Sequence, residues 1–238
     1  MTLPAPNPAL VQKLAMANRI LYQQGIVDGF GHISVRHDQS NDHFLLSCNR
    51  APGLVRPQDI LVYDLQGELV TPSGQRSYLE RFIHSEIYKA RPDVMSVVHS
   101  HSPGVIPLGA TGQRLKPVFH MSGFLGGGSA LFDIADKAGN TDMLIRNADL
   151  GRNLAEALGS HHCVLMRGHG STTTAASIEL AVYRAIYAEE NAKLQIQALA
   201  LGPVQFLNEE EAALAAASTE GQVLRPWELW ALQVGNLD

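Results

Sequence analysis

The hydrophobic positions along the chain follow two spacings, which predicts a fold that mixes helices with short strands. In four stretches the apolar residues recur every three or four positions, as on one face of a helix. Helices are therefore expected over residues 10–24, 78–90, 149–158 and 178–201. The Glu- and Ala-rich end of the chain, which contains Trp227 and Trp230, predicts a last helix and a packed end.

Short apolar or alternating runs predict strands between these helices. The expected strands cover residues 32–36, 44–46, 60–65, 94–101 and 163–166. Gly67 follows the third strand and predicts a hairpin turn there. Strand hairpins mixed with helices indicate an α/β or α+β fold with a mostly antiparallel or mixed sheet, rather than a series of βαβ units. Because no repeat or linker interrupts the pattern, one domain is expected over residues 1–238.

The charge and the cysteine content exclude several classes of protein. A net charge of −5 leaves no basic excess to neutralise the phosphates of a nucleic acid. No apolar run reaches the roughly 18–20 residues that cross a bilayer, and the first residues lack the basic and apolar regions of a signal peptide. Cys48 and Cys163 are interpreted as small buried residues in a reducing cytosol. We therefore expect a soluble cytoplasmic protein with neither nucleic acid nor membrane as partner.

Two of the ten histidines lie at the end of an apolar strand, as His99-Ser100-His101. Alternate residues of a strand project from the same face, roughly 6–7 Å apart, so both rings can bind one cation. His169, between Gly168 and Gly170, is the best candidate for a third ligand. Three nitrogen ligands leave a coordination position open, as in catalytic metal sites. On the pattern alone, ordinary hydrogen-bonded histidines remain the alternative, because spacing does not prove that the two segments meet.

The order of Glu80, His99-Ser100-His101 and Gly168-His169-Gly170 resembles the class II aldolase/adducin family. Residues 31–36 and 91–93 also match, and the resemblance covers about residues 10–201, leaving a C-terminal tail at 202–238. It implies a three-layer α/β fold in which helices flank a central, mainly antiparallel sheet. It also implies one divalent metal ion per subunit held by His99, His101 and His169, a catalytic Glu80, and homotetramers with active sites between neighbouring subunits. Mn²⁺ or Zn²⁺ is the expected ion, with Fe²⁺ or Co²⁺ as alternatives.

The chain departs from the sugar-phosphate aldolases of that family at the positions that bind phosphate. Tyr78-Leu79 stands where those enzymes have a pair of serines, and residues 47–53 replace their phosphate loop. His32 replaces a small polar residue. His120 matches the position of a catalytic tyrosine that reaches in from the next subunit. The phosphate-binding groups are thus largely missing.

Four segments resemble a second branch of the family, which includes hydroxymethylpyridine-dicarboxylate and dihydroxyphthalate decarboxylases. These segments are residues 50–52, 78–84, 99–103 and 166–170. We therefore predict a metal-dependent lyase that decarboxylates a hydroxylated aromatic or heteroaromatic carboxylate. The alternatives are a class II aldolase or epimerase acting on a small, possibly phosphorylated sugar, an iron oxygenase, and a metal-free interaction module like the adducin head.

Decarboxylation leaves electron density on a carbon, which must be delocalised onto an oxygen stabilised by positive charge. Glu80 is predicted to be the general acid/base, with a pKa raised by burial. His120, from a neighbouring subunit, is the second candidate for proton delivery.

Recognition of a carboxylate favours the forked donors of arginine. Arg50, in the segment that replaces the phosphate loop, is the first candidate, and Arg81 is a weaker one. Ser47, Asn49 and His32 are predicted to add neutral hydrogen bonds to the substrate.

Overall fold

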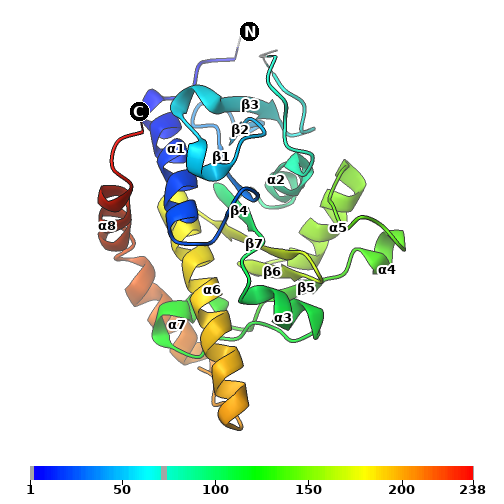
Figure 1. The fold of residues 1–238 in the computed structure, drawn as a ribbon, viewed down its shortest axis with the longest axis vertical. Coiled ribbons are helices and arrows are strands. Elements are labelled where there is room, and N and C mark those ends of the chain that lie inside the picture. The colour runs from blue at the N-terminus through cyan, green and yellow to red at the C-terminus, as the bar shows by residue number, and fades with distance from the viewer. Residues whose placement is uncertain (1–2, 71–73, 238) are drawn as a thin grey trace.

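The computed structural model describes residues 3–70 and 74–237, and within these ranges a seven-stranded sheet forms the centre (Figure 1). The strands lie in the order β3-β2-β1-β4-β7-β6-β5. Every neighbouring pair is antiparallel except β5 with β6. The strands are β1 His32–Arg36, β2 His43–Ser47, β3 Ile60–Asp64, β4 Ser96–Ser100, β5 Ala130–Phe132, β6 Cys163–Met166 and β7 Gly170–Ala175.

Helices cover both faces of this sheet, with α1 and α6 on one side and α2 and α5 on the other (Figure 1). Neighbouring residues of a strand enter opposite cores: Leu45 packs in the core of α1 and α6, whereas Phe44 and Leu46 pack in that of α2 and α5. The predicted three-layer fold is therefore confirmed. The α-helices are α1 Pro8–Gln23, α2 Arg81–Ala90, α3 Val105–Ala110, α4 Ala135–Ala138, α5 Ala148–Leu158, α6 Ile178–Leu201, α7 Glu209–Glu220 and α8 Leu224–Val234, and the 3₁₀ helices are η1 Pro52–Leu54, η2 Pro57–Asp59 and η3 His120–Leu125.

The long helix α6 has the bounds that its sequence predicts. The side chain of Ser177 accepts a hydrogen bond from the amide of Leu180 and so caps the first turn. Gly202, with φ of 146°, ends the helix at the other side. The end of the chain forms two helices rather than one, α7 and α8, and Trp230 of α8 is buried against the core that includes α1 and α6.

The prediction of a helix over residues 78–90 was wrong at its start. The helix α2 begins at Arg81, and Glu80 is its N-cap residue. Tyr78 lies outside the helix because tertiary contacts hold it: its hydroxyl donates a hydrogen bond to the carbonyl of Arg50, and its ring lies 4.6 Å from the ring of His32. The site residues of this segment are therefore in a turn, which lets them face the sheet.

Two strands, β5 and β7, are absent from the sequence prediction. β7 consists largely of serine and threonine, so the hydrophobic pattern gives no signal, although all six of its residues are buried. Threonine is nonetheless a good strand former because its branched side chain fits a pleated surface. The expected strand over 94–101 is shorter, ending at Ser100, so His101 follows the strand directly. Among the described residues, no helix is long and apolar enough to cross a membrane.

Candidate metal centre and active site

Four side chains that could bind a metal gather at the end of β4. One ligand atom from each of Glu80, His99, His101 and His169 can be chosen so that all lie within 4.8 Å of one another. His99 is in β4, His101 follows it, His169 is in the turn between β6 and β7, and Glu80 caps α2. The fold thus brings together the two histidine segments, which the spacing in the sequence alone could not join.

The pairing of β4 with β7 brings His169 to this point. His99 pairs with Thr172, and Ser100 pairs with Ser171, so the turn before β7 lies beside the end of β4. A Cβ atom on Gly170 would lie 2.0 Å from the carbonyl oxygen of Ser100, so the two backbones approach this closely because residue 170 is glycine. Gly168 has φ of 65°, which L-residues rarely adopt, and makes the tight turn. The two glycines around His169 therefore allow the tight turn and the close backbone approach that place His169 beside the end of β4.

The distances between the imidazoles fit a shared cation. Nε2 of His101 lies 3.1 Å from Nε2 of His99 and 3.0 Å from Nε2 of His169. Nitrogen atoms bound tetrahedrally to one zinc ion at about 2.0–2.1 Å lie about 3.3 Å apart. Burial lowers the pKa of His99 and of His101, so both rings are neutral near pH 7, the form that binds metal.

The hydrogen bonds of His99 orient its ring for this role. Its Nδ1 lies 3.3 Å from the hydroxyl oxygen of Thr172, and that hydroxyl donates to the sulfur of Met166 at 3.6 Å. Because the hydroxyl proton points to Met166, Nδ1 of His99 is the donor to Thr172. The lone pair of His99 is then on Nε2, which faces the cluster. Such an outer hydrogen bond commonly fixes a metal-binding histidine.

Glu80 is held as a carboxylate. Its Oε1 accepts a hydrogen bond of 2.9 Å from the amide of Ile145, and its Oε2 lies 3.6 Å from Nε2 of His99 and 3.5 Å from Nε2 of His169. Burial on its own raises the pKa of Glu80, but hydrogen bonds from His169 and from the Ile145 amide lower it below its ordinary value. The prediction of a raised pKa was wrong, because it considered burial without these partners.

A cavity of about 210 Å³ opens beside the four side chains. Glu80 and His101 lie on its polar side, whereas the apolar side includes Phe30, Leu79 and Leu144. The ring of Phe30 is 70% exposed and its centre is 6.4 Å from that of His101. The cavity therefore offers an apolar surface next to the candidate metal ligands.

Residues 12–196 match the family described as Class II Aldolase and Adducin N-terminal domain. The chain belongs to the class II aldolase and adducin family. The family prediction made from Glu80 and the histidine segments is thereby confirmed.

Relatives in the class II aldolase and adducin family include two decarboxylases. "Decarboxylase tropJ" from Talaromyces stipitatus is 41% identical over 258 aligned residues, covering 98% of this chain and 96% of that protein. The 3,4-dihydroxyphthalate decarboxylase from Arthrobacter keyseri is 30% identical and covers 84% of this chain and 82% of its own. An L-fuculose 1-phosphate aldolase structure from Glaciozyma antarctica PI12 has a TM-score of 0.78 at 24% identity over 98% of this chain and 93% of that chain, which shows the fold. The relatives support an enzyme of the lyase class.

Among the residues predicted to bind substrate, His32 and Asn49 line the cavity. Ser47 is fully buried, and its hydroxyl lies 3.2 Å from that of Tyr78, so it supports the cavity wall from behind. Tyr78 itself lines the cavity, a position that the sequence prediction used only to argue against phosphate.

The two predicted arginines lie elsewhere. Nε of Arg50 donates a hydrogen bond of 2.9 Å to the carbonyl of Leu54, and Nε of Arg81 donates a hydrogen bond to the carbonyl of Gly67. In the described residues neither arginine lines the cavity. The loop around Arg50 is bound to its own backbone, and Arg81 faces the β3 turn because α2 starts there. The prediction of Arg50 and Arg81 as substrate donors therefore has no support from their positions in this chain.

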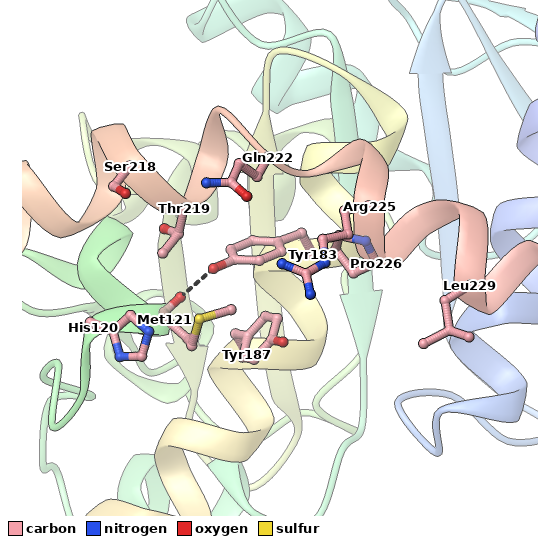
Figure 2. Close-up of a pocket in the computed structure, with 10 residues that line it drawn as sticks. All are labelled: His120, Met121, Tyr183, Tyr187, Ser218, Thr219, Gln222, Arg225, Pro226 and Leu229. Carbon is pink, nitrogen blue, oxygen red and sulfur yellow. Dashed lines mark hydrogen bonds between the residues drawn. The ribbon is translucent and has the colours of Figure 1, made fainter.

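His120 lines a second cavity, of about 400 Å³, whose described lining contains none of the four clustered side chains. Figure 2 shows His120 and Tyr187 on one side of it, Gln222 on the opposite side, and Arg225 from α8. His120 is exposed, and its ring makes no hydrogen bond within the described part of the chain. Within one chain, His120 is thus separate from the candidate metal centre.

A group of buried polar residues behind His32 is absent from the sequence prediction. Nδ1 of His32 lies 2.7 Å from Nε2 of His84, and Nδ1 of His84 lies 2.6 Å from the hydroxyl of Ser34. The spacing in the sequence could have indicated this group. His32 and Ser34 are two residues apart on a strand, and His84 and Tyr88 are four residues apart on a helix. Each pair projects from one face, and the two faces meet.

Proposed function

We propose that this protein is a metal-dependent decarboxylase of a hydroxylated aromatic or heteroaromatic carboxylate, with the ion held by His99, His101 and His169. The observation that carries the proposal is the convergence of three Nε2 atoms beside a cavity with an apolar side. Two decarboxylases among the relatives support the reaction class. Imidazole ligands suit Mn²⁺ or Zn²⁺, and also Fe²⁺ or Co²⁺.

When bound, a divalent cation supplies positive charge next to the oxygen that takes up electron density as the C–C bond breaks. The protein positions the substrate for this step. Phe30, Leu79 and Leu144 provide an apolar surface against which a flat ring can pack. Asn49 and His32 supply polar contacts at the edge of the same cavity.

Glu80 handles the proton in this proposal. As a carboxylate, it can accept the proton of the ring hydroxyl, which makes the ring electron-rich. The same group then gives the proton to the ring carbon that carries the carboxylate, and CO₂ leaves as the electron pair of the broken C–C bond passes into the ring and its oxygen. The amide of Ile145 holds the other carboxylate oxygen, so the orientation of Glu80 is maintained in both steps.

Aldol cleavage of a sugar phosphate is less well supported. The position of the serine pair in sugar-phosphate aldolases is taken by Tyr78 and Leu79, which line the cavity with a phenol and an alkyl group. Both candidate arginines lie outside the described lining, so the phosphate charge has no forked partner there.

We further propose that the protein is a homotetramer in which His120 of one subunit completes the site of its neighbour. The exposed position of His120, away from the metal ligands of its own chain, supports this arrangement. In this arrangement the site binds a small carboxylate substrate through polar groups of two subunits.

The decisive experiment is a screen of hydroxylated benzoates, phthalates and pyridine carboxylates for CO₂ release with Mn²⁺. A decarboxylase gives CO₂ from at least one compound, and His101→Ala abolishes it. Release of an aldehyde from a sugar phosphate, with no CO₂ from any carboxylate, would overturn the proposal in favour of an aldolase.

A further inference from the structure

A chain of four buried side chains leads from the cavity into the interior. It runs from His32 through His84 and Ser34 to Tyr88, with contacts of 2.7 Å, 2.6 Å and 2.7 Å between successive polar atoms. Each of the four residues is at most 3% exposed. Since Nδ1 of His32 is used by His84, Nε2 is the ring nitrogen left for the cavity that His32 lines.

The hydrogens in this chain all point the same way. His32 and His84 are each at most 3% exposed, and neither ring forms an ion pair among the described residues, so both are buried as neutral imidazoles. A neutral imidazole has one donor and one acceptor, and a hydroxyl has one donor. Each contact holds one hydrogen, and within the described residues the Ser34 hydroxyl has only His84 and Tyr88 as side-chain partners. Because its own buried hydrogen needs one of these two as acceptor, the three contacts point the same way.

The buried end of the chain selects the direction. If the hydrogens pointed inward, the hydroxyl of Tyr88 would have to donate to the carbonyl of Met95, which is 3.5 Å away. That carbonyl already accepts a hydrogen bond of 2.8 Å from the amide of Arg36. If the hydrogens point outward, Tyr88 donates to Ser34 at 2.7 Å and every buried donor has a near acceptor.

We propose that this chain fixes His32 as a hydrogen-bond donor, with Nε2–H directed into the cavity to bind an anionic oxygen of the substrate. His32 is then the residue that selects a carboxylate or phenolate, the task that the sequence assigned to Arg50. His84 and Ser34 are positioning residues that act through His32. The choice of substrate rests on the proposed function, whereas the direction of the chain does not.

The direction can be measured without a substrate. Two-bond ¹H–¹⁵N spectra of the full-length, Zn²⁺-loaded protein with labelled histidines report which ring nitrogen carries the hydrogen. The signals are assigned with His32→Gln and His84→Gln. We expect His32 and His84 to carry the hydrogen on Nε2 at pH 7. A hydrogen on Nδ1 of either ring would overturn the inference, whatever the protein catalyses.

Removal of single hydroxyls tests the functional consequence. Ser34→Ala removes the donor to His84 and is expected to raise KM about tenfold, the value of one hydrogen bond to a charged group, with a smaller change in kcat. In Tyr88→Phe the hydroxyl of Ser34 keeps His84 as its acceptor, so KM stays within about twofold. Ser85→Ala is the matched control. Ser85 is a buried serine of α2, the helix that also carries His84 and Tyr88, and its hydroxyl has no partner within the described residues.

A purely structural role gives a different pattern. Tyr88→Phe and Ser34→Ala would then lower Tm by similar amounts and change KM equally, and this outcome would overturn the proposal. If no aromatic carboxylate is decarboxylated, the proposed function fails, and the NMR result still decides the direction of the chain.

Discussion

The cluster at the end of β4 and the cavity around His120 are both rich in polar groups, but they hold these groups differently. In the cluster, Glu80 and His99 are buried and each has a further partner, the amide of Ile145 or the hydroxyl of Thr172. In the second cavity, Arg225 is exposed and makes no side-chain hydrogen bond or ion pair within the described residues. The groups of the first site support one another within one chain, whereas His120 and Arg225 in the second cavity have no side-chain hydrogen bond among the described residues.

The two sites differ in how much of their role can be recognised from a single chain. Burial and mutual support make the candidate metal centre recognisable from one chain, because buried polar groups without partners would be costly there. Exposed groups such as His120 carry no such cost, so their role depends on what binds them. The following predictions separate the two cases.

Metal removal should have the largest effect, and it tests the cluster. Treatment with a chelator should lower activity at least about 10⁴-fold, because the metal supplies several kcal/mol of transition-state stabilisation. Added Mn²⁺ should restore activity in the native protein but not in His101→Ala. Bound metal is counted by elemental analysis. His43→Ala, on β2 and outside the cluster, is the control and should keep both metal and activity.

Glu80→Gln should lower kcat by about 10³-fold, within the range of general acid–base catalysis, while the metal content stays near that of the native protein. Glutamine keeps an oxygen for the amide of Ile145 but cannot take up a proton. The kcat and the metal content are measured together. Loss of metal as in His101→Ala would instead make Glu80 a ligand and contradict its proposed role.

His120→Ala should lower kcat by about 10²-fold without loss of metal, since its cavity is separate from the ligands. Mixing this variant with His101→Ala before assembly should restore part of the activity, because some sites then combine an intact metal centre with an intact His120. Failure of the mixture to recover activity, with exchange of subunits verified by mass spectrometry, would break the proposed division between neighbouring chains.

The smallest effect concerns stability against pH. Burial lowers the pKa of His84 to about 3 in the folded protein, whereas an unfolded histidine titrates near 6.5. Below pH 6.5 the unfolded chain binds the extra proton, so stability is constant above that pH and falls as the pH drops toward 3. The loss between pH 7 and pH 5 is about 2 kcal/mol for this one group. Urea unfolding of chelator-treated protein measures it, and His84→Gln should reduce the pH dependence while His43→Gln should not.

The sequence alone predicted much of the cluster, for a physical reason. An apolar strand that ends in His99-Ser100-His101 places two rings on one face whatever the rest of the fold is. The helix α6 was equally predictable, because Ser177 and Gly202 mark its ends locally. Such features depend on neighbours in the chain.

The features that failed depend on distant parts of the chain. The pairing that brings His169 to His101 runs through β7, whose serines and threonines look like a loop by hydrophobicity. Tyr78 leaves the helical pattern because Arg50 and His32 hold it. The lowered pKa of Glu80 depends on His169 and, to a smaller degree, on the amide of Ile145, which is 65 residues away in the sequence. These contacts have no local signature.

The irregular segment 139–147 affects both the shape of the cavity and the position of Glu80, two properties that an enzyme engineer would wish to adjust separately. Leu144 lines the cavity that is proposed to hold the substrate ring, and the next residue, Ile145, donates a backbone hydrogen bond to the carboxylate of Glu80. A library built on this segment would therefore change which ring is accepted and how fast it reacts at the same time, while every imidazole stays untouched. Selection for a new ring at Leu144 should be paired with a check on turnover.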